Sequence, residues 1–260
     1  MNQGILRVPI QKILSYKPLW VILSLTLFAE FSLIFILSNL SQSAITGSGV
    51  SLLKFNFPEI WLNLSWLGKL GNYIIGFLLI FIISADEEHL TLRQHIIDGW
   101  SREQAALSYH MLCLVFAFLS IIVAIIFSLI FGYSEPDLPV IEFNQVRILL
   151  CFFLQSFLIF QFALLVSVCV KKAVPALFCF LGWLLIAEPL IGVVIDTNIR
   201  KGYSELLPFH TIGKLLPDLN PMGMISGAST VVSINYILIS IAYVWLFGIL
   251  IWARIRFRDL

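Results

Sequence analysis

Long runs of apolar residues constrain this chain more than any other feature of its sequence. Several runs within its 260 residues approach or reach the roughly 20 residues that an α-helix needs to cross the hydrocarbon core of a bilayer. Because lipid offers no water to backbone N–H and C=O groups, such segments fold as helices. The sequence therefore predicts an all-α polytopic membrane protein, with a single transmembrane domain over residues 1–260. Its six transmembrane helices are expected at about 19–37, 70–85, 105–131, 148–170, 174–195 and 231–253.

The composition supports this class. Charged residues make up 12% of the chain, whereas an average soluble domain carries roughly 25%. The net charge of +1 provides no general attraction for a polyanion. These values exclude a soluble globular domain, a disordered tail and a nucleic-acid binder, so the expected surroundings are the lipid bilayer. The four cysteines have no CxxC spacing and are interpreted as packing residues, not as disulfides or zinc ligands.

Lys and Arg residues near the ends of the spans predict that both termini are cytoplasmic, because cytoplasmic loops of membrane proteins are enriched in these residues. With this N-in, C-in orientation the cytoplasmic side carries Arg7, Lys12, Lys17, Arg93, Arg102, Lys171, Lys172, Arg254, Arg256 and Arg258. The outer side carries Lys54, Lys69, Arg147, Arg200, Lys201 and Lys214.

Two further segments lie beside the spans. Residues 1–18 alternate apolar and basic residues, which predicts an amphipathic helix on the cytoplasmic face. Trp61 and Trp66 precede the second span, where they fit an aromatic belt at the membrane interface. The fairly apolar segment 197–230 is interpreted either as short helices partly inserted from outside or as an ordinary surface loop.

The most polar stretch of the chain lies between the second and third spans. Ser84 with Glu87, and Ser101 with Gln104, have the spacing of capping boxes. Gly99 is a natural helix stop. We therefore expect a short amphipathic helix, a glycine turn and the capped start of the third span. By these residues alone, the helix either lies on lipid headgroups or receives a soluble partner.

The run Thr91-Leu92-Arg93-Gln94-His95-Ile96-Ile97-Asp98-Gly99-Trp100-Ser101-Arg102 resembles the corresponding loop of ABC-2 type transporter permeases. In that family an acidic residue, a T-x-R element and a G-x-S-R element precede the third span, and the six-span layout is also similar. The resemblance implies that loop 86–102 forms a coupling helix that docks into a separate ATP-binding cassette ATPase subunit. The implied partner-binding residues are Thr91, Leu92, Arg93, His95, Ile96, Ile97, Asp98, Gly99, Trp100, Ser101 and Arg102.

The resemblance also implies a function. The chain is expected to be the permease subunit of an ATP-driven exporter in the plasma (inner) membrane of a bacterium, paired with a second permease subunit, identical or related. The sequence contains no G-x-x-x-x-G-K-[ST] loop to cradle phosphates, so ATP and Mg²⁺ are expected on the partner ATPase subunit. No cofactor, metal or catalytic residue is expected in this chain. The alternative is a non-transporting assembly or sensing subunit that docks a cytoplasmic partner through the same loop.

A less favoured alternative is an intramembrane hydrolase. Glu87-Glu88 with Arg93 nearly matches the EE-x-x-x-R signature of CAAX-type proteases, but the spacing is one residue too long. Such enzymes also need histidines within hydrogen-bond reach of the nucleophilic water, on later membrane helices. A solvated helix face explains the acidic and histidine residues of this loop better than a metal site does.

Glu30 and Glu188 place ionisable groups at membrane depth. A carboxylate there costs several kcal/mol unless it is paired, protonated or facing water. Both are therefore candidates for a polar pathway or a dimer interface, and a hydrogen-bonded structural group is the alternative for Glu30. Pro189, beside Glu188, is the candidate for a bend that opens a hinge in the fifth span.

Overall fold

A computed structural model describes residues 17–47, 55–88, 91–97, 99–133, 143–198, 201–216 and 234–257. Within these ranges, six helical segments are long and apolar enough to cross a membrane. They are α2 (Lys17–Gly47), α3 (Ile60–Glu88), α5 (Arg102–Phe131), α6 (Phe143–Val170), the continuous run of α7 (Ala173–Gly182), π-helix η1 (Trp183–Ala187) and α8 (Glu188–Asn198), and α10 (Ile234–Arg256). Three short elements connect them: α4 (Thr91–Ile97), the 3₁₀-helix η2 (Tyr203–Leu206) and α9 (Pro208–Leu215).

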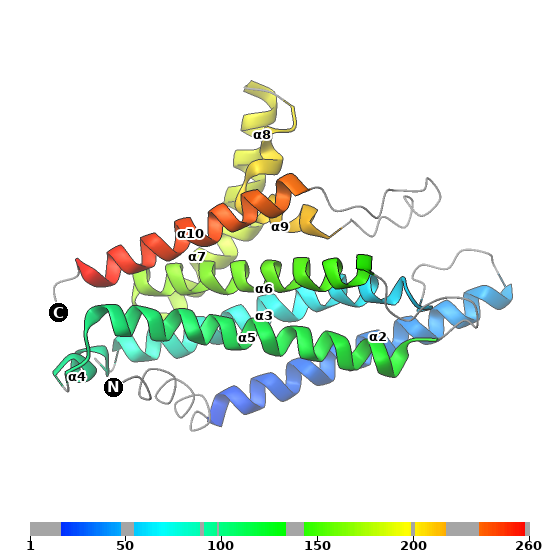
Figure 1. Cartoon of the computed structure of the whole chain (residues 1–260), viewed down its shortest axis with the longest axis horizontal. Helices are drawn as coiled ribbons and strands as arrows, with labels where there is room; N and C mark the ends of the chain where they lie inside the picture. Colours follow the sequence, from blue (N-terminus) through cyan, green and yellow to red (C-terminus); the bar gives the residue numbers. More distant parts are fainter. Residues whose placement is uncertain are drawn as a thin grey trace.

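The long helices form a bundle around α6. Figure 1 shows α3, α5, α6 and α10 extending along the long axis of the molecule, whereas α8 projects away from it. Phe152 and Phe160 of α6 are almost fully buried, and Phe160 packs edge-on against Phe116 of α5. Phe162, also on α6, contacts Phe180 of α7. Since lipid is as apolar as these side chains, this interlocked packing supplies much of the attraction between the helices.

The second span begins about ten residues earlier than the sequence predicts, at Ile60 rather than residue 70. The added turns contain Asn63 and Ser65, which lower the hydropathy but are buried inside the bundle. Trp61 is only 2% exposed and packs against Phe57. The expectation of an interfacial belt is therefore wrong for Trp61, because this tryptophan lies in the protein core.

The turn between α6 and α7 contains the basic pair Lys171 and Lys172. Lys171 has a φ of 66° between α6 and α7, so the chain reverses within two residues. The predicted amphipathic helix over 1–18 falls almost wholly outside the described residues, as do 217–233 of the segment before the last span. The described part of that segment contains η2 and α9, and α9 buries Phe209, Ile212 and Leu215.

Candidate functional site

Helix α4 lies in the loop between α3 and α5, where the sequence predicts a short helix. The hydroxyl of Thr91 donates a hydrogen bond to the backbone oxygen of Asp86 at 3.0 Å, and Oδ1 of Asp86 lies 3.1 Å from the same hydroxyl. Tyr109 of α5 donates to Oδ2 of Asp86 at 3.4 Å. Asp86 is only 5% exposed. Through these hydrogen bonds it links the end of α3 to Thr91 of α4 and to Tyr109 of α5.

The turn after α4 has the predicted geometry. Gly99 has a φ of 97°, a conformation that favours glycine, and its N–H donates to the Ile96 carbonyl at 3.1 Å. Ser101 and Gln104 form the predicted capping box at the start of α5, through reciprocal bonds of 3.2 and 3.0 Å. The capping box predicted at Ser84 is wrong: α3 continues to Glu88, and the Ser84 hydroxyl contacts that of Ser167 at 2.9 Å.

The predicted partner-binding residues within 91–102 divide into some that face the bundle and some that face outward. Ile96 is half-buried and packs against the core, and Trp100 is also half-buried. Ile97 is 84% exposed. The backbone of Leu92, Arg93 and His95 lies on α4, but their side chains and the whole of Asp98 fall outside the described part of the chain. Ile97 is therefore the apolar side chain that α4 presents outward among those described.

The same end of the bundle includes the last turn of α10. The Arg102 guanidinium donates to the backbone oxygen of Arg256 at 2.6 Å. Arg256 in turn lies over the ring of Trp252, with 4.7 Å between the guanidinium carbon and the ring centroid. Loop 86–102 and the C-terminal helix are thus connected directly, although 154 residues separate Arg102 and Arg256.

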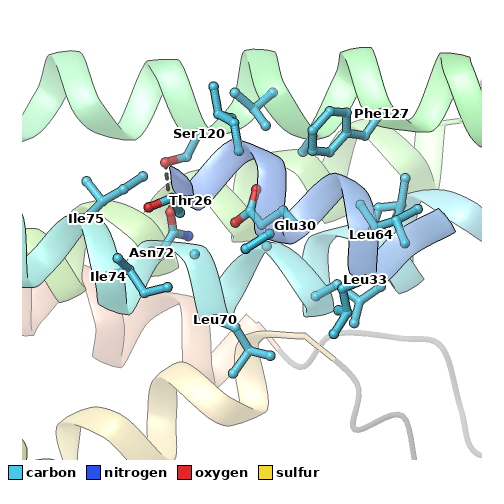
Figure 2. Close-up of a pocket in the computed structure, with 18 of the residues that line it drawn as sticks. Thr26, Glu30, Leu33, Leu64, Leu70, Asn72, Ile74, Ile75, Ser120 and Phe127 are labelled. Carbon is cyan, nitrogen blue, oxygen red and sulfur yellow. Dashed lines mark hydrogen bonds between the residues drawn. The ribbon is translucent and has the colours of Figure 1, made fainter. Parts of the chain in front are cut away.

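Glu30 lies near the middle of the first span and lines a cavity of about 170 Å³ between α2, α3, α5 and α6. Figure 2 shows Glu30 with Thr26, Asn72 and Ser120 in the middle of this space, and apolar side chains on both sides. The Glu30 carboxyl approaches α3 at Gly71, where a Cβ would overlap Oε1. The absence of a side chain at Gly71 is therefore what admits the carboxyl group against α3.

Asn72 lines the cavity and forms a polar connection among three helices. Its amide nitrogen donates to the Ser156 hydroxyl of α6 at 2.7 Å, and its oxygen accepts from the Ser120 hydroxyl of α5 at 2.7 Å. Asn72, Ser120 and Ser156 are all buried. Isolated polar residues within apolar runs are the only sequence signal for this network, and the sequence does not show that the three converge.

Glu188 occupies a different site, where the fifth span meets α9. It is 1% exposed, and its Oε1 accepts from the backbone N–H of His210 at 2.7 Å. The Nδ1 of His210 lies 3.2 Å from the same oxygen, and Trp183 Nε1 donates to Oε2 at 3.0 Å. Within the described chain, Glu188 therefore binds protein groups, whereas Glu30 faces a cavity.

The fifth span is one continuous helical run with a π-helix in its middle. The predicted bend at Pro189 is preceded by the π-helix Trp183–Ala187, in which the N–H of Glu188 bonds to the Trp183 carbonyl five residues back. A π-turn adds a residue to one helical turn and often marks a functional position. Here it brings the indole of Trp183 and the carboxylate of Glu188 within hydrogen-bond distance.

The structure thus places loop 86–102 at one end of the helix bundle, beside the last turn of α10. Glu30 and Glu188 lie in two separate sites. His210, Asn72 and Gly71 complete these sites and were not predicted from the sequence. Comparison of the chain with protein-family models and with curated proteins gave no match.

Proposed function

We propose that this chain is the membrane-spanning subunit of an ATP-driven transporter of the ABC-2 type, acting as an exporter with ATP hydrolysed on a separate subunit. The observation that carries the proposal is α4, a compact helix at one end of the bundle that presents Ile97 outward. The resemblance of residues 91–102 to the coupling loop of such permeases supports it.

The contacts of α4 suit a part that transmits movement. Asp86 joins it to α3 and to Tyr109 of α5, and the capping box at Ser101 fixes the start of α5. The bond from Arg102 to the Arg256 carbonyl extends the connection to α10. A displacement of α4 would therefore shift the ends of three long helices. A partner drives such a shift when it binds the two positions of α4 with different affinity.

Charge favours a cytoplasmic location for α4 and, with it, the N-in, C-in orientation. The Arg102–Arg256 contact and the Ser84–Ser167 contact put α4 at the same end as Lys171, Lys172 and Arg254. Basic residues at the ends of spans concentrate on the cytoplasmic side of membrane proteins. On this side α4 would be within reach of a soluble ATPase.

The fifth span supports pairing with a second permease subunit. Its α8 end projects from the bundle in Figure 1, and the span carries many exposed large apolar side chains. They are Val174, Phe178, Leu185, Ile186, Leu190, Ile191, Val193 and Val194. Lipid or another copy of a membrane subunit must cover this surface, and in the proposed complex a second permease covers part of it.

The decisive variant is Ile97→Glu, assayed in membranes that contain the ATPase partner. Because Ile97 is 84% exposed, the variant should insert and unfold at the same temperature as the parent, but lose most of the coupling between ATP hydrolysis and transport. Ile97→Leu is the matched control and should retain coupling. Normal coupling in Ile97→Glu would show that α4 is not the docking element.

Purification from native membranes separates the proposal from its alternative. An affinity-tagged chain should recover a soluble subunit that carries a G-x-x-x-x-G-K-[ST] loop. Recovery of a cytoplasmic partner without that loop would instead support an assembly or sensing subunit. Recovery of the chain as a lone monomer would oppose the transporter proposal.

A further inference from the structure

The Glu30 carboxyl has no hydrogen-bond or ion-pair partner within the part of the chain that the structure describes, although it lies near the middle of a spanning helix. Glu188, the other acidic residue deep in a span, accepts hydrogen bonds from two protein donors. An intramembrane carboxylate without a partner is costly, and such residues commonly mark a ligand or ion site. The cavity beside Glu30 leaves room for a partner that the described residues do not supply.

The polar groups around this space are mainly acceptors. Thr26 donates its hydroxyl proton to the Ile22 carbonyl at 2.8 Å, so its oxygen can only accept a hydrogen bond from a ligand. Ser120 directs its proton to Asn72 at 2.7 Å or to the Phe116 carbonyl at 3.0 Å. A carboxylate beside hydroxyl groups whose protons are already engaged favours a ligand that donates hydrogen bonds and carries positive charge.

The rest of the lining is apolar and limits the size of the ligand. Leu64, Leu67, Phe127 and Phe152 form walls from α3, α5 and α6. At about 170 Å³ the cavity is slightly larger than the roughly 150 Å³ engineered cavity that accepts a benzene molecule. It therefore has room for one ring or a short branched chain with a small polar head.

Entry is available from the apolar surface of the bundle. Leu33 of α2 and Leu70 and Ile74 of α3 line the cavity, and all three are exposed. The cavity consequently opens between α2 and α3 on a face of the kind that meets lipid. A molecule with an apolar body can reach this opening by partitioning into the bilayer.

The geometry points to a binding site for small organic ammonium ions, in which Glu30 pairs with the ammonium group and the α2–α3–α5 walls enclose the apolar body. The site belongs to this chain alone and needs no ATPase partner. That such an ion is the exported cargo would rest on the proposed function, whereas its binding here does not.

The test uses the purified chain in nanodiscs of zwitterionic phosphatidylcholine and titrates 4-fluorobenzylammonium by ¹⁹F NMR, with empty nanodiscs subtracted. The neutral probe 4-fluorobenzyl alcohol has nearly the same shape. The parent should bind the ammonium ion at least about tenfold more tightly than the alcohol, which corresponds to 1.4 kcal/mol. Glu30→Gln should remove that preference and leave the affinity for the alcohol nearly unchanged.

Two controls make the result specific. Glu103→Gln removes an exposed carboxylate of α5 outside the cavity and should not change either affinity. Val123→Phe fills the cavity from α5 and should weaken both probes. Equal binding of the two probes by the parent, or undiminished ammonium binding by Glu30→Gln, would overturn the proposal. The comparison of the two probes uses the parent chain, so it tests the preference for the ammonium ion even if a variant folds poorly.

Discussion

The carboxylate of Glu188 accepts a 2.7 Å hydrogen bond from the backbone N–H of His210, which joins the fifth spanning helix to α9. The same side chain binds the indole of Trp183, one π-turn earlier in its own helix. Helix α9 is held from a second direction, because Gln155 of α6 donates to the Ile212 carbonyl at 2.8 Å. A buried carboxylate thus satisfies donors from two elements and fixes the position of α9.

Replacing Glu188 should destabilise the fold according to how many acceptors remain. Glu188→Leu leaves the Trp183 indole and the His210 amide without their acceptors, and because both donors are only part-buried the loss should be at the low end of about 1–3 kcal/mol for each. Glu188→Gln keeps one oxygen acceptor and should lose less. Thermal unfolding followed by fluorescence-detected size-exclusion chromatography measures both. Equal unfolding midpoints for the parent and Glu188→Leu would show that these bonds contribute little.

A methyl group at Gly71 should displace the Glu30 carboxyl from α3. The Cβ of Gly71→Ala would overlap Oε1, which is the far end of a flexible side chain, so the cost should lie at the low end of the range for an overpacked position, about 1 kcal/mol. The double variant Gly71→Ala, Glu30→Ala should recover this small loss of thermal stability, because the colliding group is gone. Gly248→Ala is the matched control, since nothing lies within 4 Å of its added Cβ. If the single and double Gly71 variants unfold alike, the Glu30–Gly71 contact is not the cause.

The sequence was sufficient for features that depend on nearby residues and insufficient for those that depend on helix packing. The capping box at Ser101 and the stop at Gly99 were predictable, because each is decided within a few residues. The depth of Glu30 followed from the length of its apolar run. Its approach to Gly71 did not, since two helices must first pack together.

The wrong predictions have the same origin. Ser84 and Glu87 have the spacing of a capping box, but the helix does not end there, and the Ser84 hydroxyl contacts Ser167 of α6 instead. Trp61 has the residue type of an interfacial belt but is buried against Phe57. In both positions a tertiary contact outweighs the local pattern.

Removing the Asn72 amide should weaken the attachment of α3 to both α5 and α6. Asn72→Leu deletes the 2.7 Å bonds to Ser120 and Ser156, and interhelical bonds of this kind are worth about 0.6–2 kcal/mol each in membrane proteins. Ser156→Ala removes only one of them and should lower the unfolding temperature less. A double-mutant cycle over Asn72 and Ser156 measures their coupling. A coupling of zero would mean that the pair is formed without contributing to stability.

The proposed N-in, C-in orientation predicts which side of the membrane each end of α5 meets. This helix has 30 residues, so at 1.5 Å per residue it extends about 45 Å and separates Ile97 from Tyr133 by a full membrane thickness. Both side chains are exposed, and cysteines there should be reachable by a membrane-impermeant maleimide. The exposed Cys169 and Cys179 are first replaced by Ser, while Cys113 and Cys151 are buried and can remain. Tyr133→Cys should then react in intact cells, and Ile97→Cys only in inside-out vesicles. The reverse pattern would place α4 outside the cell, beyond the reach of any cytoplasmic ATPase.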